Sequence, residues 1–306
     1  MLPTLLEIYR STRNVDCEER AFVLTAVGVP SVIDHEGYEY VIRVDAEQAL
    51  LAREHLERYA VESRPLPPPP PLPPLHPFAW VGCAVYVLVL LIVGYSVAGG
   101  VWRLDAFEVG DLDGARMQAG EWWRAWTALT LHVDAAHLAT NLGAGVWFGY
   151  LAGRQLGAGL AWLLVVLGAG AANLLEGMFG PAAHHAVGAS TAVFAALGAL
   201  SAHAWRSRFS PRDRWVRRWG PLVAGVILLG WLGTGGGEQA DAFGTAIVDR
   251  SIDVVGHLAG FVMGAVLGVV VALPSIKRWI APVPQWLAGG AALAIVAVTW
   301  VLALQS

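Results

Sequence analysis

The chain has 306 residues, of which 56% are hydrophobic and 14% are charged, and its mean hydropathy is +0.54. Soluble domains carry about 25% charged residues, so this composition predicts an integral membrane protein and excludes an ordinary soluble enzyme. The formal net charge of −4 gives no indication of nucleic-acid binding. The two cysteines fall in an apparently cytosolic segment and in an apolar stretch, which argues against a structural disulfide.

Residues 1–63 are predicted to form a small α+β domain on the cytoplasmic side, and Glu7 with no apolar run of useful length argues against a signal peptide. An apolar cluster at 21–24 favours a short helix. Segments 31–34 and 38–44 are typical of two strands joined by a His-Glu-Gly turn. Asp45 can then cap a helix. We find no catalytic constellation in this segment, and its partner or ligand is not indicated.

Residues 64–77 are a proline-rich linker, because nine of the thirteen residues 65–77 are proline. Such a segment is expected to be an extended spacer. Seven apolar stretches follow, each near the length needed to cross the hydrocarbon of a bilayer. They lie at about 79–100, 137–153, 157–179, 190–205, 219–234, 252–273 and 285–304. The first six stretches lie within residues 78–275, and the seventh, with the loop before it, lies within residues 276–306.

The charges of the loops predict the orientation. Nine basic residues occupy the loops after the second, fourth and sixth stretches: Arg154, Arg206, Arg208, Arg212, Arg214, Arg217, Arg218, Lys277 and Arg278. The opposite side has four: Arg103, Arg116, Arg124 and Arg250. Since basic loops stay in the cytoplasm, the N-terminus is predicted to be cytoplasmic and the C-terminus extracytoplasmic.

This orientation brings three polar residues to the same depth. Asn141, Ser190 and His257 each lie near the start of a stretch that runs from outside to inside. A serine at a helix start is more often a cap than a nucleophile, but an ionisable side chain inside a membrane is usually functional. A nucleophilic serine needs a base and an oxyanion stabiliser. His137, four residues before Asn141, shares its helix face and can donate a hydrogen bond.

The glycine pattern predicts that the stretches with Ser190 and His257 pack together. Gly260, Gly264 and Gly268 form a G-x-x-x-G-x-x-x-G face close to that of His257, and the stretch after Ser190 is rich in alanine. Small residues let membrane helices approach closely.

Other polar residues receive structural roles. His132 is expected to hold its loop by a hydrogen bond, and Arg124, in a Trp-rich loop, to pair with a carboxylate or a lipid phosphate. The neighbouring His184 and His185 suggest a metal ion, but there is no H-E-x-x-H or paired-cysteine spacing. We therefore predict no metal.

Together these motifs resemble the rhomboid intramembrane serine proteases over about residues 80–275. The matching positions are Trp123-Arg124, the His132, His137 and Asn141 set, Gly188-x-Ser190, and His257-x-x-Gly260-x-x-x-Gly264. The resemblance implies that Ser190 is the nucleophile and His257 the base, a dyad without a carboxylate. It also implies that His137, Asn141 and the Ser190 backbone amide bind the oxyanion.

Two positions depart from the family pattern. Thr191 replaces the glycine after the nucleophile, where a β-branched residue would crowd the turn. Phe194 stands where a tyrosine often packs against the histidine, so it keeps the ring and loses a hydroxyl.

We expect an all-α polytopic membrane protein, with a rhomboid-like six-helix core, a seventh transmembrane helix and the small N-terminal domain. We expect it to be an intramembrane serine endopeptidase of the plasma (inner) membrane that needs no cofactor. It would cleave transmembrane or membrane-proximal segments of proteins in the lipid bilayer, near the extracytoplasmic face, with no nucleic acid as partner. A rhomboid-like pseudoprotease that binds membrane clients without cleaving them is the alternative. A transporter is a second alternative, although a transporter should have charged groups along a pathway through the midplane of the membrane.

Overall fold

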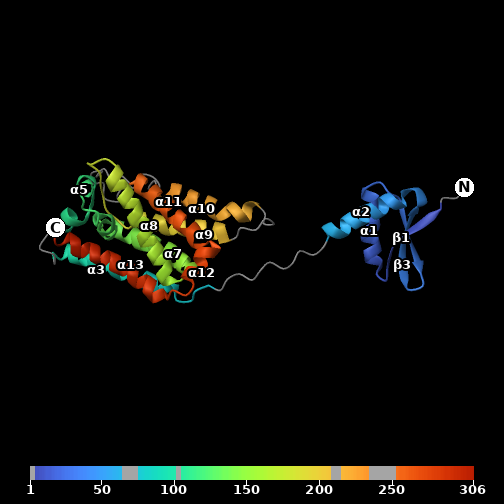
Figure 1. Ribbon diagram of the computed structural model, residues 1–306, viewed down its shortest axis with the longest axis horizontal. Helices are drawn as coiled ribbons and strands as arrows, with labels where there is room; N and C mark the ends of the chain where they lie inside the picture. The colour runs from blue at the N-terminus through green and yellow to red at the C-terminus, as the bar shows by residue number, and fades with distance from the viewer. Residues whose placement is uncertain (1–3, 64–74, 101–104, 208–214, 234–252) are drawn as a thin grey trace. The chain divides into compact units, whose positions relative to one another are not determined.

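The computed structural model describes residues 4–63, 75–100, 105–207, 215–233 and 253–306. For residues 217–218 it describes the backbone alone. The chain divides into two compact units, Met1–Pro73 and Pro74–Ser306, which Figure 1 shows as a small α+β unit and a helical bundle. Each unit is described by itself.

The N-terminal unit is a three-stranded antiparallel sheet with two helices. Its elements are β1 (Leu5–Ser11), α1 (Asn14–Ala26), β2 (Ser31–Glu36), β3 (Glu39–Asp45), the 3-10 turn η1 (Ala46–Gln48) and α2 (Ala49–Glu62). The strand order β1-β3-β2 places β3 in the centre. Strand β1 was not predicted from the sequence, because a register shift between Glu7 and Tyr9 breaks its alternation.

Long helices make up most of the helical unit within the described residues. They are α3 (Ala79–Ala98), α7 (Ala135–Leu156), α8 (Ala158–Phe179), α9 (Ser190–Ser207), α10 (Trp215–Gly233), α11 (Val254–Val271) and α13 (Gln285–Ala303). In the same part of the chain, α3, α8, α11 and α13 are long and apolar enough to cross a membrane. Helix α9 is buried along most of its length, so protein rather than lipid surrounds it and a strongly apolar surface is not required.

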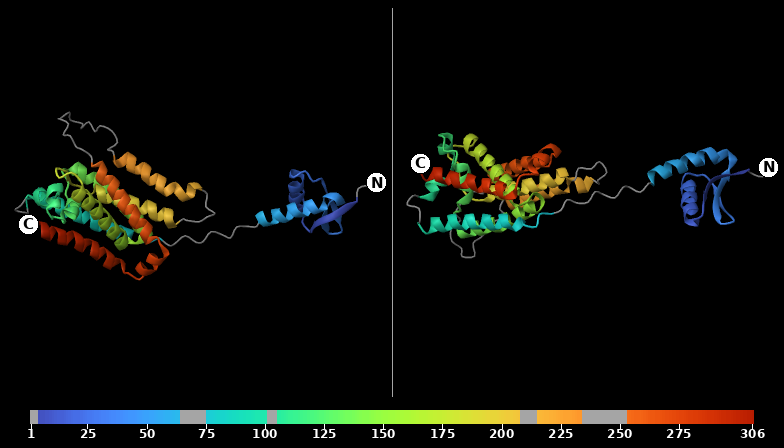
Figure 2. Two further views of the ribbon diagram at one scale, coloured as in Figure 1. Left: turned by 45° about the horizontal axis from the view of Figure 1, so that its top comes forward. Right: turned by 60° about the horizontal axis from the view of Figure 1, so that its bottom comes forward.

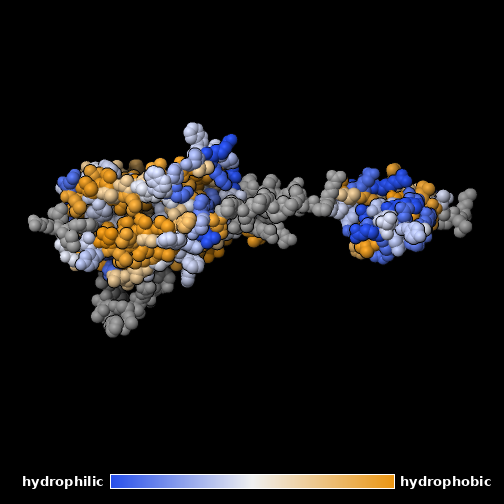
Figure 3. All heavy atoms as spheres, turned by 90° about the horizontal axis from the view of Figure 1, so that it is seen from below, coloured by the Kyte–Doolittle hydropathy of each residue, from blue (hydrophilic) through white to orange (hydrophobic). Residues whose placement is uncertain are grey.

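Large hydrophobic side chains cover the outside of this unit. Figure 3 shows them over much of one face of the bundle, and Leu88, Leu91 and Ile92 of α3 are among those exposed. Exposed apolar surface of this extent is unfavourable in water and is what a bilayer requires. The protein is therefore an integral, multi-pass membrane protein.

Helices α9 and α11 are in direct backbone contact. A Cβ atom at Gly264 would collide with the carbonyl oxygen of Ala195, and one at Gly268 with that of Ala199. The two helices run side by side, with α10 beside them, in both views of Figure 2. The close packing predicted from the glycine pattern is confirmed.

The loop between α3 and α7 is structured and joined to the loop between α8 and α9. It contains α4 (Ala106–Gly110), β4 (Leu112–Asp113), α5 (Gly114–Gln118), α6 (Arg124–Thr127) and the 3-10 turn η2 (Ala128–Thr130). Strand β4 pairs antiparallel with β5 (His185–Ala186). This pairing ties the first loop to the segment that leads into α9.

The last helix, α13, follows a short helix α12 (Pro274–Ile280) and is anchored at both ends. At one end, the amide of Gln285 accepts from the backbone N–H of Leu160 at 3.0 Å and donates to the carbonyl of Leu156 at 3.3 Å. At the other, Trp300 Nε1 donates to Thr130 Oγ1 at 3.0 Å. The bonds to Thr130 and Leu160 connect α13 to the first loop and to the start of α8.

Candidate active site

Ser190 and His257 lie in the first turns of the two helices that touch most closely. Ser190 is the first residue of α9, and His257 is in the first turn of α11, where its N–H donates to Asp253 O at 3.1 Å. One turn after His257, a Cβ atom at Gly260 would lie 2.5 Å from the carbonyl oxygen of Thr191. Thr191, the residue after Ser190, therefore touches α11 one turn beyond His257. The first turns of α9 and α11 thus lie next to each other.

Phe194 packs directly against His257. Their ring centroids are 4.5 Å apart with the planes inclined by 39°, and Phe194 is almost fully buried. The ring expected beside the histidine is therefore present. Because Phe194 lies one turn after Ser190, the same helix carries Ser190 and one wall of the imidazole pocket.

Thr191 does not distort the turn at Ser190. Thr191 is the second residue of α9, and no residue other than glycine has a positive φ in the described part of the chain. Its methyl group would be 3.0 Å from a Cβ atom at Gly260. Because glycine has no side chain, α11 leaves room for that methyl group. The crowding expected from a β-branched residue is relieved by α11.

His137 and Asn141, both in the first two turns of α7, lie beside the turn that leads to Ser190. A Cβ atom at Gly188 would be 2.7 Å from Nε2 of His137 and 3.8 Å from Nδ2 of Asn141. Gly188 also has a φ of +130°, which residues other than glycine rarely adopt. Asn141 is buried, with Nδ2 donating to His137 O at 3.0 Å. Two potential hydrogen-bond donors thus converge near Ser190.

His132 holds the same turn from another side. Its Nε2 accepts from the backbone N–H of Ala189 at 3.3 Å, and its ring contacts that of His137 edge-on at 5.1 Å. Burial, with the neighbouring His137, lowers the pKa of His132 to about 4, so the imidazole is neutral at neutral pH and Nε2 keeps its lone pair. His132 thereby fixes the backbone immediately before Ser190.

A family model described as the Rhomboid domain matches residues 119–274, just over half of the chain. The chain belongs to the rhomboid family. The match includes every site residue predicted from the sequence, from Arg124 in the first loop to Gly264 in α11, and excludes the N-terminal unit.

A curated relative gives the same assignment. Rhomboid protease GluP of Bacillus subtilis (strain 168) is 30% identical over 193 residues, which are 62% of this chain and 35% of the relative. The chain therefore aligns with about a third of the length of that rhomboid protein.

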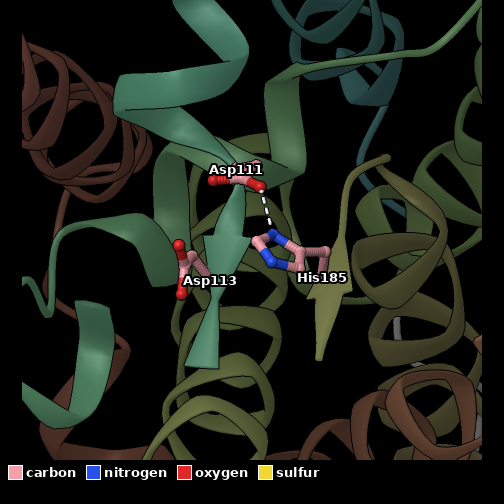
Figure 4. A group of neighbouring side chains, drawn as sticks. All are labelled: Asp111, Asp113 and His185. Atoms are coloured by element: carbon pink, nitrogen blue, oxygen red, sulfur yellow. Dashed lines mark hydrogen bonds and ion pairs between the residues drawn. The ribbon is translucent and has the colours of Figure 1, made fainter. Parts of the chain in front are cut away.

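Within the rhomboid domain, Arg124 is a structural centre of the first loop. The guanidinium is fully buried and pairs with Glu121 at 2.6 Å and with Asp111 at 2.7 Å. The other oxygen of Asp111 lies 2.8 Å from His185 Nδ1, as Figure 4 shows between β4 and β5. Arg124 therefore pairs with protein carboxylates, and Asp111 extends the network to the loop between α8 and α9, the third loop of the helical unit.

Two side chains that support the site were not predicted from the sequence. Tyr86 of α3 donates its hydroxyl to Asn141 O at 2.9 Å, and Asp134 caps α7 by accepting from His137 N at 2.8 Å. Asp134 had a sequence signal, an acidic residue directly before a helix. Tyr86 had none, because only packing brings α3 beside α7.

Proposed function

We propose that this rhomboid protein is an intramembrane serine endopeptidase, with Ser190 as nucleophile and His257 as base. The adjoining first turns of α9 and α11 support this assignment, since Thr191 touches Gly260 and Phe194 packs on His257. A nucleophile and its base need hydrogen-bond contact, and backbone contact between two helices makes such contact possible.

In the proposed reaction, His257 takes the proton of Ser190 Oγ as the oxygen attacks a peptide carbonyl. His257 then gives that proton to the leaving amine. In the second step His257 takes a proton from a water molecule, which attacks and hydrolyses the acyl-enzyme. The negative charge on the carbonyl oxygen would be stabilised by the Ser190 backbone N–H, free at the start of a helix, and by His137 and Asn141. This chemistry needs no cofactor.

The substrates would be transmembrane or membrane-proximal protein segments in the same bilayer. Under the predicted orientation, Asn141, Ser190 and His257 lie near the extracytoplasmic face of the plasma (inner) membrane. A peptide bond in an intact helix is shielded by its own hydrogen bonds, so segments with Gly or Pro, which weaken a helix by about 1–3 kcal/mol, should be cut preferentially.

We propose the division of the chain that the sequence suggested: a cytoplasmic domain at 1–63, a linker at 64–77, a catalytic core at 78–275 and a further helix in 276–306. The family match at 119–274 lies within the proposed core. The two-unit organisation is in keeping with a separate N-terminal domain.

A pseudoprotease that binds clients without cleaving them is the alternative function. It would be expected to lack Ser190 or His257, and both are present. The hydrogen bond from Ala189 N to His132 and the close approach of His137 to Gly188 also favour a protease, because a client-binding surface does not require a positioned nucleophile turn.

The deciding experiment measures cleavage of a transmembrane-segment reporter by the purified full-length protein in liposomes. Ser190→Ala and His257→Ala should each lower turnover by at least about 1000-fold, since members of a catalytic dyad act as a unit. Ser201→Ala is the matched control, because Ser201 is a buried serine on the same helix and should retain activity.

A fluorophosphonate that reacts with activated serines gives a second readout. It should label the wild-type protein at Ser190 and leave Ser190→Ala unlabelled, as peptide mapping would show. Near-normal cleavage by either dyad variant would disprove the assignment. A folded wild-type protein that neither cleaves nor reacts would be a pseudoprotease.

A further inference from the structure

Three side chains from separate elements converge at the start of α11, away from the proposed dyad. Glu176 is in the last turn of α8, His184 precedes β5, and Asp253 caps α11. One ligand atom from each lies within 4.8 Å of those from the other two. His184 Nε2 is 3.2 Å from Glu176 Oε1.

Glu176 is the unusual member, because its side chain is only 5% exposed. In the described part of the chain no N–H or O–H donor meets its Oε2, whose neighbour is the carboxylate of Asp253. That oxygen would lie 2.8 Å from a Cβ atom at Gly256, which would also collide with Asp253 Oδ2. The unpartnered oxygen is therefore aimed at the carboxylate of Asp253.

Two carboxylates in such a place need either a shared proton or a positive charge, because a buried anion without compensation costs several kcal/mol. At Asp111 that charge comes from Arg124. For Glu176 and Asp253, no arginine or lysine among the described residues is paired with either. The imidazole of His184 is the neighbour, and it is itself a common metal ligand.

We propose that Glu176, His184 and Asp253 bind a divalent transition-metal cation such as Zn²⁺. Imidazole nitrogens and carboxylate oxygens are both ligands of this ion, and three protein ligands leave one position of a tetrahedral site for water. Ligands about 2.0–2.1 Å from a tetrahedral ion lie roughly 3.3 Å apart. The separation of 3.2 Å between His184 Nε2 and Glu176 Oε1 matches this spacing.

The position of the site gives the cation a positioning role. Asp253 accepts from Gly256 N at 2.7 Å through its Oδ1 and from His257 N through its backbone oxygen. A cation held by Glu176, His184 and Asp253 would join the end of α8 and the third loop to the first turn of α11. It would thereby restrict movement of His257 relative to Ser190, a consequence that rests on the proposed peptidase function, whereas cation binding itself does not.

The test is titration of metal-free, purified full-length protein with Co²⁺, followed by its visible absorption, and then with Zn²⁺ in competition. The substitutions Glu176→Gln, His184→Gln and Asp253→Asn each remove one ligand with little change of shape. Asparagine can still cap α11, so Asp253→Asn should fold. His185→Gln is the matched control, because the neighbouring His185 pairs with Asp111 instead.

We expect the wild type and His185→Gln to bind one high-affinity Co²⁺ per chain at this site. Each of the three ligand variants should bind at least roughly 10–100-fold more weakly, as even outer-shell substitutions do. Zn²⁺ should raise the melting temperature of the wild type and fail to do so in the ligand variants. Circular dichroism checks that each variant is folded.

The proposal is wrong if the wild type binds no stoichiometric cation, or if folded ligand variants bind it as tightly as the wild type does. The latter result would place the cation elsewhere in the chain. These outcomes are measured by cation binding and do not depend on proteolysis. If Ser190→Ala failed to abolish cleavage, that result would disprove only the peptidase assignment.

Discussion

The imidazole of His257 rests on the phenyl ring of Phe194, with ring centroids 4.5 Å apart. Both side chains are buried, and they belong to the two helices whose backbones touch. A flat apolar wall on one face of an imidazole limits its rotation. Phe194 is therefore expected to act through His257, as a positioning residue for the proposed base.

Replacement of Phe194 tests this relationship. Phe194→Ala should lower kcat by about 10–100-fold, because small misplacement of a reacting group costs up to about 100-fold. Phe194→Tyr, which keeps the ring, should retain most activity. Reporter kinetics with melting temperatures would separate this effect from unfolding. Equal loss of activity in both folded variants would contradict a role of the ring itself.

Asn141 tests the proposed oxyanion site. Asn141→Ala should lower the chemical step by about 10–1000-fold if Nδ2 stabilises the oxyanion. The range is wide because His137 and the Ser190 amide can compensate. Thr140→Ala is the control, since Thr140 is exposed on the same helix. Single-turnover rates decide the matter, and an unchanged rate in Asn141→Ala would assign Asn141 a structural role.

His132 predicts a pH dependence of stability. Its pKa is about 4 in the folded protein and 6.5 as an ordinary value. Between these values the unfolded chain binds more protons, so the free energy of unfolding should fall as the pH is lowered from about 6.5 to about 4. Melting temperatures of the wild type and His132→Gln should differ most near neutral pH and converge toward pH 4. A pH-independent difference would refute the assignment.

Thiol labelling tests the orientation. Ala182 follows α8 and Ser275 lies in α12, and both are exposed. In a chain whose buried Cys17 and Cys83 are replaced by alanine, Ala182→Cys should react with an impermeant reagent from outside intact cells. Ser275→Cys should react only after the membrane is opened. The reverse pattern would overturn the charge argument.

The sequence by itself indicated which residues could form the candidate site and which apolar stretches carry them. Apolar stretches of membrane length and the G-x-x-x-G-x-x-x-G pattern depend on local composition and helical periodicity, so they can be read without coordinates. The glycine pattern of α11 correctly predicted its close contact with α9. The roles of Ser190 and His257 remain proposals.

The same local patterns carried little information on the loops and the small strands. Strand β1 escaped notice because its register shift interrupts the alternation. Strands β4 and β5 have two residues each, too few for a periodic signal. Their pairing nevertheless determines how the first and third loops are joined.

Only the tertiary structure decided which distant side chains meet. The fit of Thr191 against Gly260 and the hydrogen bond from Tyr86 to Asn141 O depend on the angle and depth at which helices pack. The prediction of no metal was based on residue spacings within one element. Glu176 and Asp253 instead approach His184 from separate helices. Periodicity specifies the face of a helix on which a residue lies, and packing between helices determines what that face contacts.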